Sequence, residues 1–588
     1  MKKIFLTPLI LILCFSGCKK KSEENNNKET VIHQAKGGRL YGGVFRINET
    51  SYFKNLFPHN IIDVYAHRIA NQVYEGLFKY SQEDLSLKPC LIETYSVDST
   101  GRIFIFKIKR GVYFHDDPCF PNGVGRELKA KDFKFCFDLL CTKDINNQGF
   151  SGTFKNKVVG ATKYYDTGKT ENGVEGIKVV DDYTLQIELE KPYLPFLNVM
   201  ASPFTFVFPR EAIEKYGAAG LRAKAIGTGP FILKNIDEDI SVILTKNEKY
   251  HGVDVYGNKL PFLDAIKITF IKDQKTELFE FKKGNLDIIY KLPTEHIIDI
   301  LSSENSTLQG EYKKYKLQRN PEMSVFFYDF LCIGKTFYNK KIRQAFSYAI
   351  DKRKIVDFVL NGSAFEPGIY GITPPTFKGY DVSKISGYSY DQEKARRLMS
   401  EAGFPGGKGF PKIVLDIDEG GGIHKRVAEE IQKQLKEILN IHLDLNFVSF
   451  AQKVEKVSMG NYDIARQGWI ADFPSPENFL WLFYGKDVPQ KINEMSYPNS
   501  SRYSNPEFDK IYEAALAAPN IQESYSLFMK AENMVMADAP VLVLWYDESY
   551  RILQQYVLNF PNNPMQYRDM SEVYFSKSDT TQTAKVVK

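Results

Sequence analysis

The chain of 588 residues is long enough for more than one domain, because a domain commonly takes about 100–200 residues. Its 77 basic and 72 acidic residues leave a net charge of +5, which is too small for a nucleic-acid binder unless the charge is clustered. Apolar residues make up 43% and charged residues 25%, as in an ordinary globular protein.

The first eighteen residues have the pattern of an export signal. Lys2 and Lys3 precede an apolar run, residues 4–15, that is too short for a typical membrane-spanning helix. Small residues then lead to Cys18, as in a bacterial lipoprotein signal in which residues 1–17 are removed and the cysteine is lipidated. The alternative is an ordinary secretory leader with a chance cysteine. Residues 18–36 begin with a polar, low-complexity stretch, so we expect the lipidated cysteine to be followed by a flexible tether.

The remaining cysteines indicate neither a disulfide framework nor a metal site. Cys14 leaves with the leader, and five cysteines at irregular spacing remain besides Cys18. We expect all five to be small buried hydrophobic residues.

Hydrophobic periodicity predicts alternating strands and helices, which indicates a sheet with helices packed on its faces. The expected strands lie at 37–47, 101–114 with a break at 110–111, 231–235, 287–289, 413–417, 441–447 and 541–546, with a hairpin at 179–189 that turns at 181–182. The expected helices lie at 61–78, 129–140, 276–284, 340–360, 390–402, 424–439, 505–517 and 522–536.

Motifs of common enzymes are missing from the sequence. It contains no GxSxG, GxxxxGK[ST] or HExxH, and its eight histidines form no HxH or HxxxH pair. We therefore expect no catalytic residue, no metal and no cofactor.

Residues 461–480, NYDIARQGWIADFPSPENFL, are predicted to line a cleft. They begin as a strand and turn at Trp469 into a loop rich in proline and aromatic residues. Within them Arg466 and Asp472 lie six residues apart, a span of up to roughly 20 Å in an extended chain. A short extended zwitterion has the same layout of opposite charges.

Seven segments in order resemble family 5 solute-binding proteins of bacterial ABC importers, most of all the oligopeptide-binding and dipeptide-binding members. They read YEGLF, FKIKRGVYFHD, GTGPF, PFLDAIKITFI, NKKIRQAFSYAIDK, YDQEKARRLMSEAGFP and GNYDIARQGWIADFPSPENFL. The resemblance implies an α/β, type II periplasmic-binding-protein fold, with two lobes closing on a cleft plus an extra third domain. Lobe I would comprise residues 37–88, 198–323 and 547–580, the extra domain residues 89–197, and lobe II residues 324–546.

The same resemblance implies a set of ligand-binding residues. Asp472 matches the aspartate that pairs with a peptide's α-ammonium, and its alternative role is that of a turn residue before Pro474. Arg466 and His424 match residues that receive the ligand carboxylate; for Arg466 the alternative is an ion pair with Asp463 or Asp472. The remaining matches are the pocket aromatics Trp469 and Tyr546, and Gly468 and Ile470, whose backbone would pair with the peptide.

We therefore expect a monomeric, lipid-anchored receptor outside the cytoplasm that captures short peptides and delivers them to an ABC permease and ATPase complex. Residues 416–423 lack the arginine-containing loop of dipeptide binders, which favours the oligopeptide-type arrangement. A non-peptide solute, such as an oligosaccharide or metal chelate, is the alternative ligand. A surface hydrolase is a third possibility, disfavoured by the missing motifs.

Overall fold

A computed structural model describes residues 34–168, 172–302, 307–418, 421–565 and 567–576. The predicted leader and Cys18 lie outside the described residues. Among the described helices, none is both long enough and apolar enough to cross a bilayer.

The first sheet has four strands in the order β1–β10–β9–β8. β1 (Val44–Asn48) and β10 (Ala265–Thr269) are parallel, and β9 (Ser241–Lys246) and β8 (Phe231–Asp237) follow in antiparallel fashion. Helix α1 (Val64–Val73) begins where the Asp63 side chain accepts a hydrogen bond from the Ala66 N–H, which caps the helix.

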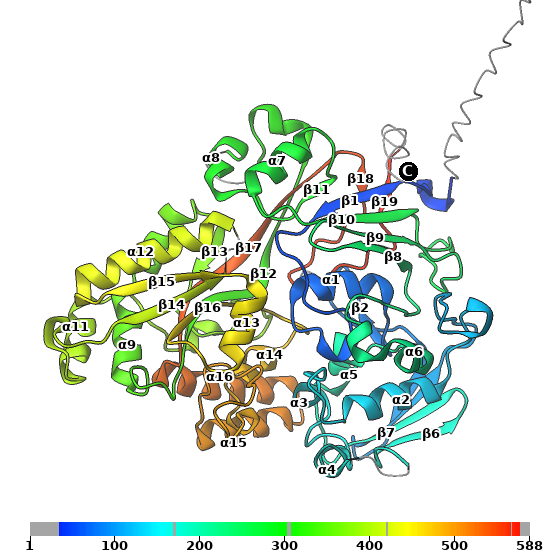
Figure 1. The fold of residues 1–588 in the computed structure, drawn as a ribbon, viewed down its shortest axis with the longest axis horizontal. Helices are drawn as coiled ribbons and strands as arrows, with labels where there is room; N and C mark the ends of the chain where they lie inside the picture. Colours follow the sequence, from blue (N-terminus) through cyan, green and yellow to red (C-terminus); the bar gives the residue numbers. More distant parts are fainter. Residues whose placement is uncertain (1–33, 169–171, 303–306, 419–420, 566, 577–588) are drawn as a thin grey trace, which may run out of the picture.

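The largest sheet has seven strands, and it contains the strand predicted to line the cleft. Its order is β11–β17–β12–β16–β14–β15, with β13 paired to β17. The strands are β11 (Ile288–Ile289), β12 (Lys316–Phe330), β13 (Ala364–Pro367), β14 (Ile413–Asp418), β15 (Leu443–Val448), β16 (Ile464–Ile470) and β17 (Val541–Leu553). Helices α9 (Lys340–Ala349), α11 (Gln392–Glu401) and α12 (Gly421–Leu439) flank this sheet (Figure 1).

Strands β12 and β17 form a long antiparallel pair that reaches from the largest sheet towards the first sheet. Near Asp329, β12 pairs with β16. Near Lys316, β12 pairs with the end of β17, and the other edge of β17 pairs with β11. There the Asp287 N–H donates to the Arg46 carbonyl of β1 at 2.8 Å, which links this end to the first sheet. Between Pro321 and Val325 the β12–β17 register shifts, so the regular ladder is interrupted midway.

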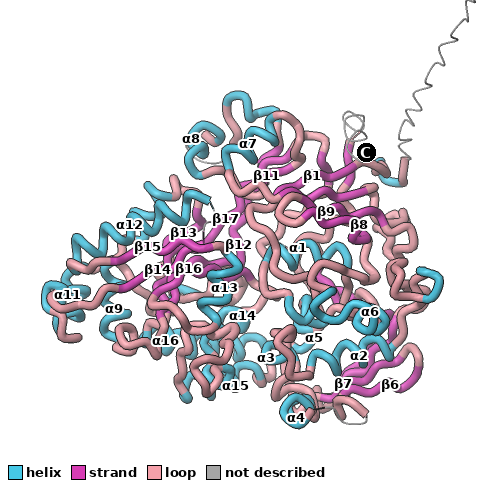
Figure 2. Tube along the Cα trace, in the orientation of Figure 1, coloured by secondary structure: helices cyan, strands magenta, loops and turns pink. Residues whose placement is uncertain are grey.

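A third sheet has the order β4–β5–β7–β6, from β4 (Ile92–Val97), β5 (Ile103–Ile108), β6 (Ile177–Asp181) and β7 (Thr184–Glu188). Helix α2 (Ala130–Leu140) packs against it, and Figure 2 shows β6 and β7 of this sheet apart from the labelled strands of the other two sheets. Besides short 3-10 turns, the other described helices and strands are α3 (Phe150–Thr153), α4 (Ala161–Thr167), α5 (Phe196–Val199), α6 (Arg210–Gly220), α7 (Gln274–Lys282), α8 (Ile297–Ile300), α10 (Lys352–Lys354), α13 (Phe450–Ser458), α14 (Glu477–Leu480), α15 (Pro506–Leu516), α16 (Ile521–Asp538), β2 (Phe78–Tyr80), β3 (Leu87–Pro89), β18 (Val557–Leu558) and β19 (Tyr574–Phe575).

Two predicted helices differ from the structure. The helix expected over 340–360 is broken, because Ile350 is extended and the Asp351 side chain caps a new turn by accepting from the Lys354 N–H. Residues Ile355–Val359 then form a π-helical turn. The helix expected over 61–78 ends at Val73, since Tyr74 is extended and the chain continues into β2.

Candidate functional site

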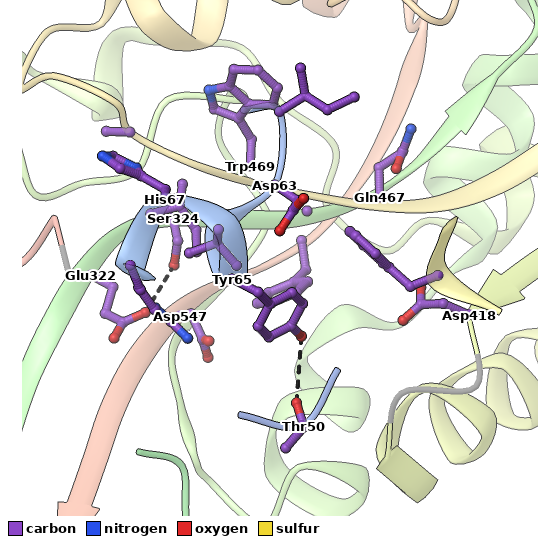
Figure 3. Close-up of a pocket in the computed structure, with 18 of the residues that line it drawn as sticks. Thr50, Asp63, Tyr65, His67, Glu322, Ser324, Asp418, Gln467, Trp469 and Asp547 are labelled. Carbon is purple, nitrogen blue, oxygen red and sulfur yellow. Dashed lines mark hydrogen bonds between the residues drawn. The ribbon is translucent and has the colours of Figure 1, made fainter. Parts of the chain in front are cut away.

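A cavity of about 380 Å³ lies between α1 on one side and β16 with α13 on the other. Its lining also includes residues of β12, β17 and the loop that follows β16. Figure 3 shows the labelled side chains of α1, β12 and β16 meeting around this space. The cavity is therefore built from segments that are far apart in the sequence.

One edge of β16 is open along the cavity. Its other edge pairs with β12 from Ile464 to Ile470, whereas β14 pairs only with Ile464 and Ala465. Among the described strands, none pairs with the second edge from Arg466 to Ile470. Arg466, Gly468, Trp469 and Ile470 all line the cavity, as predicted for residues 461–480.

Arg466 belongs to a cluster of charges around Asp418. The Asp418 carboxylate lies 3.2 Å from Arg466, 2.9 Å from the Lys453 ammonium and 3.1 Å from the His424 Nδ1. Burial opposes ionisation of Asp418, but the neighbouring Arg466 and Lys453 cations outweigh it and hold its pKa well below the usual range. The Arg466 ion pair is thus formed with Asp418, and neither with Asp463 nor with Asp472.

His424 lies in this cluster as a neutral imidazole at pH 7. Its burial lowers its pKa to about 4, and the nearby Arg466 guanidinium acts in the same direction. The ring lines the cavity from α12. The structure therefore brings His424 and Arg466 together, as expected from the sequence, and adds Asp418 and Lys453 to them.

Asp472 lies at the opposite end of β16, just beyond Ile470, and it also lines the cavity. Burial raises the pKa of its carboxyl to about 6, and the Asn478 side-chain amide offsets part of the rise. No lysine, arginine or histidine of the described chain forms an ion pair with this carboxyl. The site can therefore accept a cation.

The loop around Asp472 is held by a shared acceptor. The Asn478 Oδ1 atom accepts from the Trp469 indole N–H at 2.8 Å and from the Asp472 backbone N–H at 3.1 Å. The Trp469 ring also lies 6.5 Å from Trp481 and 6.3 Å from Tyr497, centroid to centroid. These contacts form an aromatic wall beside the carboxyl.

The structure does not bring Tyr546 to the cavity. Its side chain is fully buried, and its hydroxyl donates to the Gly371 carbonyl at 2.7 Å. Trp545 and Asp547, its neighbours on β17, line the cavity instead. Because every residue of β17 is buried, alternation along this strand could not indicate which side chains face the ligand space.

Sequence reasoning also missed cavity residues from distant segments. Asp547 forms an ion pair with Lys291 at 2.6 Å, and the Tyr65 ring of α1 meets Phe450 of α13 edge-on at 5.8 Å. No local motif marks these pairs, since each joins two segments hundreds of residues apart. Among the described residues no cluster of three or more His, Cys, Asp or Glu side chains could hold a metal.

Comparison with known proteins finds one matching family, related sequences and similar solved structures. Residues 86–490 match the sequence profile of the family described as bacterial extracellular solute-binding proteins, family 5. The chain is 25% identical to heme-binding protein A of Haemophilus influenzae over 584 residues, covering 96% of this chain and 97% of that protein. It is 26% identical to the oligopeptide-binding protein OppA of Bacillus subtilis over 510 residues, covering 84% and 85%. In structure it is similar to DppA of Helicobacter pylori in complex with the peptide STSA, with a TM-score of 0.77, 22% identity and coverage of 92% and 99%.

Proposed function

The chain belongs to family 5 of the bacterial extracellular solute-binding proteins, and from this premise we propose that its cavity captures short extended peptides. As a family member it is a solute-binding protein of an ABC importer rather than an enzyme. Its fold is the mixed α/β fold of the OppA-type and DppA-type binding proteins.

The observation that carries the peptide proposal is the open edge of β16 that ends beside Asp472. An extended peptide can add to such an edge through backbone hydrogen bonds, which recognise any sequence. The peptide's α-ammonium would then pair with the Asp472 carboxyl, for which the described residues supply no cation.

The other end of the peptide would face Arg466. One negative charge on Asp418 stands against two positive charges on Arg466 and Lys453, so the cluster retains one positive charge. This surplus suits a carboxylate, with the neutral His424 ring beside it. Over six extended residues the two ends are at most roughly 20 Å apart, which corresponds to a short peptide.

The architecture we propose keeps the predicted division of the chain. Lobe I comprises 37–88, 198–323 and 547–580, lobe II comprises 324–546, and 89–197 form the extra domain. The interruption between Pro321 and Val325 of β12, close to the proposed boundary, supports a hinge between the lobes. We also propose that Cys18 is lipidated and that the receptor acts as an anchored monomer.

Native mass spectrometry of the receptor purified from a bacterial host tests the ligand class. We expect the native protein to be heavier than its polypeptide chain because of bound material that is released on denaturation. Sequencing should identify this material as a mixture of short peptides. Recovery of a sugar, a metal chelate or haem in its place would refute the peptide proposal. The non-peptide alternative is kept as the second candidate because one relative is named as a haem-binding protein.

A further inference from the structure

Residues 149–193, which include parts of the third sheet, contact the segment that follows Asp472. None of the described residues in this range lines the cavity. Tyr193, a few residues beyond β7, donates its hydroxyl to the Glu477 Oε1 atom at 2.5 Å. Both side chains are buried, with 6% of Tyr193 and 3% of Glu477 exposed. Glu477 is the first residue of α14, directly before Asn478.

A second contact from the same region involves Trp481, which directly follows α14. Gly152 of α3 lies so close to the Trp481 ring that an added Cβ would come within 2.3 Å of it. The Lys155 ammonium also lies 3.0 Å from Asp487, whose carboxyl accepts from the Trp481 indole N–H at 2.9 Å. Trp481 is thus held from the α3 side and in turn packs against Trp469.

Asn478 lies between these two points of attachment and is fully buried. Its Oδ1 atom accepts the Trp469 and Asp472 N–H groups, so the position of α14 sets the position of both residues. We propose that the region of residues 149–157 and 193 positions the ammonium-binding loop, with Tyr193, Glu477 and Asn478 as positioning residues.

This assigns a function in ligand recognition to a part of the chain that does not touch the ligand, and it rests on the proposed ammonium role of Asp472. In the proposed division, Tyr193 belongs to the extra domain and Glu477 to lobe II. The contact therefore forms only when these two parts meet. Closure of the cleft would then complete the ammonium site as well as enclosing the peptide.

The contact between Tyr193 and Glu477 depends on one hydrogen bond, which the Tyr193 hydroxyl donates. Among the described residues the second carboxyl oxygen of Glu477 has no hydrogen-bond partner. Burial raises the pKa of Glu477 to about 7, while the nearby Lys157 charge and the Tyr193 hydroxyl oppose the rise. Removing the hydroxyl leaves a buried carboxyl without its donor, so we expect α14 to shift towards another donor or water.

Tyr193→Phe in the full-length receptor tests the proposal, with Tyr380→Phe as a matched control. Tyr380 donates in the same way to the buried Glu532 at 2.5 Å, and neither residue lines the cavity. We expect Tyr193→Phe to weaken binding of a free-amine peptide about tenfold and of its N-acetylated form less than twofold. Asn478→Ala should have the same effect or a larger one, and Tyr380→Phe should change neither affinity.

Tryptophan emission of the ligand-free protein gives a second readout that does not depend on the ligand. Trp469 and Trp481 are two of only three tryptophans, so we expect a shifted emission maximum in Tyr193→Phe and Asn478→Ala but not in Tyr380→Phe. An unchanged emission and unchanged affinities in Tyr193→Phe would overturn the positioning role. If the wild-type protein binds both peptides equally, the ammonium role of Asp472 fails, and a shifted emission would still support the contact itself.

Discussion

Replacing Asp472 by asparagine removes one charge from the cavity and keeps the shape of the side chain. In the complex the carboxyl and the ligand's ammonium would both be removed from bulk water, because the carboxyl is already desolvated enough to raise its pKa to about 6. Loss of one member of a buried ion pair costs about 3 kcal/mol at the low end of the measured range. Since about 1.4 kcal/mol is a tenfold change, the dissociation constant should rise roughly 100-fold.

Isothermal titration with a free-amine peptide and its N-acetylated form checks this value. The N-acetylated peptide carries no ammonium, so Asp472→Asn should change its affinity less than about threefold. Melting curves of the two proteins control for damage to the fold. An equal loss of affinity for both peptides would refute the reasoning, because the carboxyl would then act on something other than the ammonium.

Three further perturbations follow from the same site. Affinity for free-amine peptides should fall as the pH drops below about 6, because the unliganded Asp472 carboxyl takes up a proton there that binding must release. Titrations at pH 7, 6 and 5 should show this loss of affinity in the wild type and no such loss in the asparagine variant. Asp418→Asn leaves Arg466 and Lys453 as buried cations without their anion, so it should lower the free energy of unfolding by about 3 kcal/mol and with it the melting temperature. Adding Lys453→Met should restore part of this loss. An unchanged melting temperature in Asp418→Asn would contradict the ion-pair account. Gly468→Val places a Cβ 2.9 Å from the Phe326 ring and should displace the open edge of β16. Free-amine and N-acetylated peptides should then lose affinity equally, because both would pair with this edge through their backbones. Intact binding of either peptide would argue against such pairing.

Local sequence patterns predicted the elements whose signals lie within a short segment. The hairpin predicted at 179–189 corresponds to β6 and β7, and α2 follows its predicted range within one residue. The break after α9 was missed because residues 340–360 keep a helical apolar pattern, which shows neither the extended Ile350 that ends α9 nor the new turn that the Asp351 side chain caps.

The residue pattern predicted the part of the candidate site that follows a single strand, and the family resemblance added His424 from α12. β16 and the loop after it carry Arg466, Trp469 and Asp472 in one continuous segment, and all three line the cavity. Asp418 and Lys453 join them from β14 and α13, a pairing across 35 residues that no spacing rule reveals. Asn478 lay within the predicted stretch, but its role depends on the turn that brings it back to Trp469.

A crystal structure of the receptor with a bound free-amine peptide tests the central claim most directly. The account predicts the peptide's amino nitrogen within hydrogen-bond distance of the Asp472 carboxyl, its backbone paired with the edge from Arg466 to Ile470, and its carboxylate towards the Arg466 cluster. A peptide bound in the reverse direction, or one that leaves Asp472 without a cation, would contradict it.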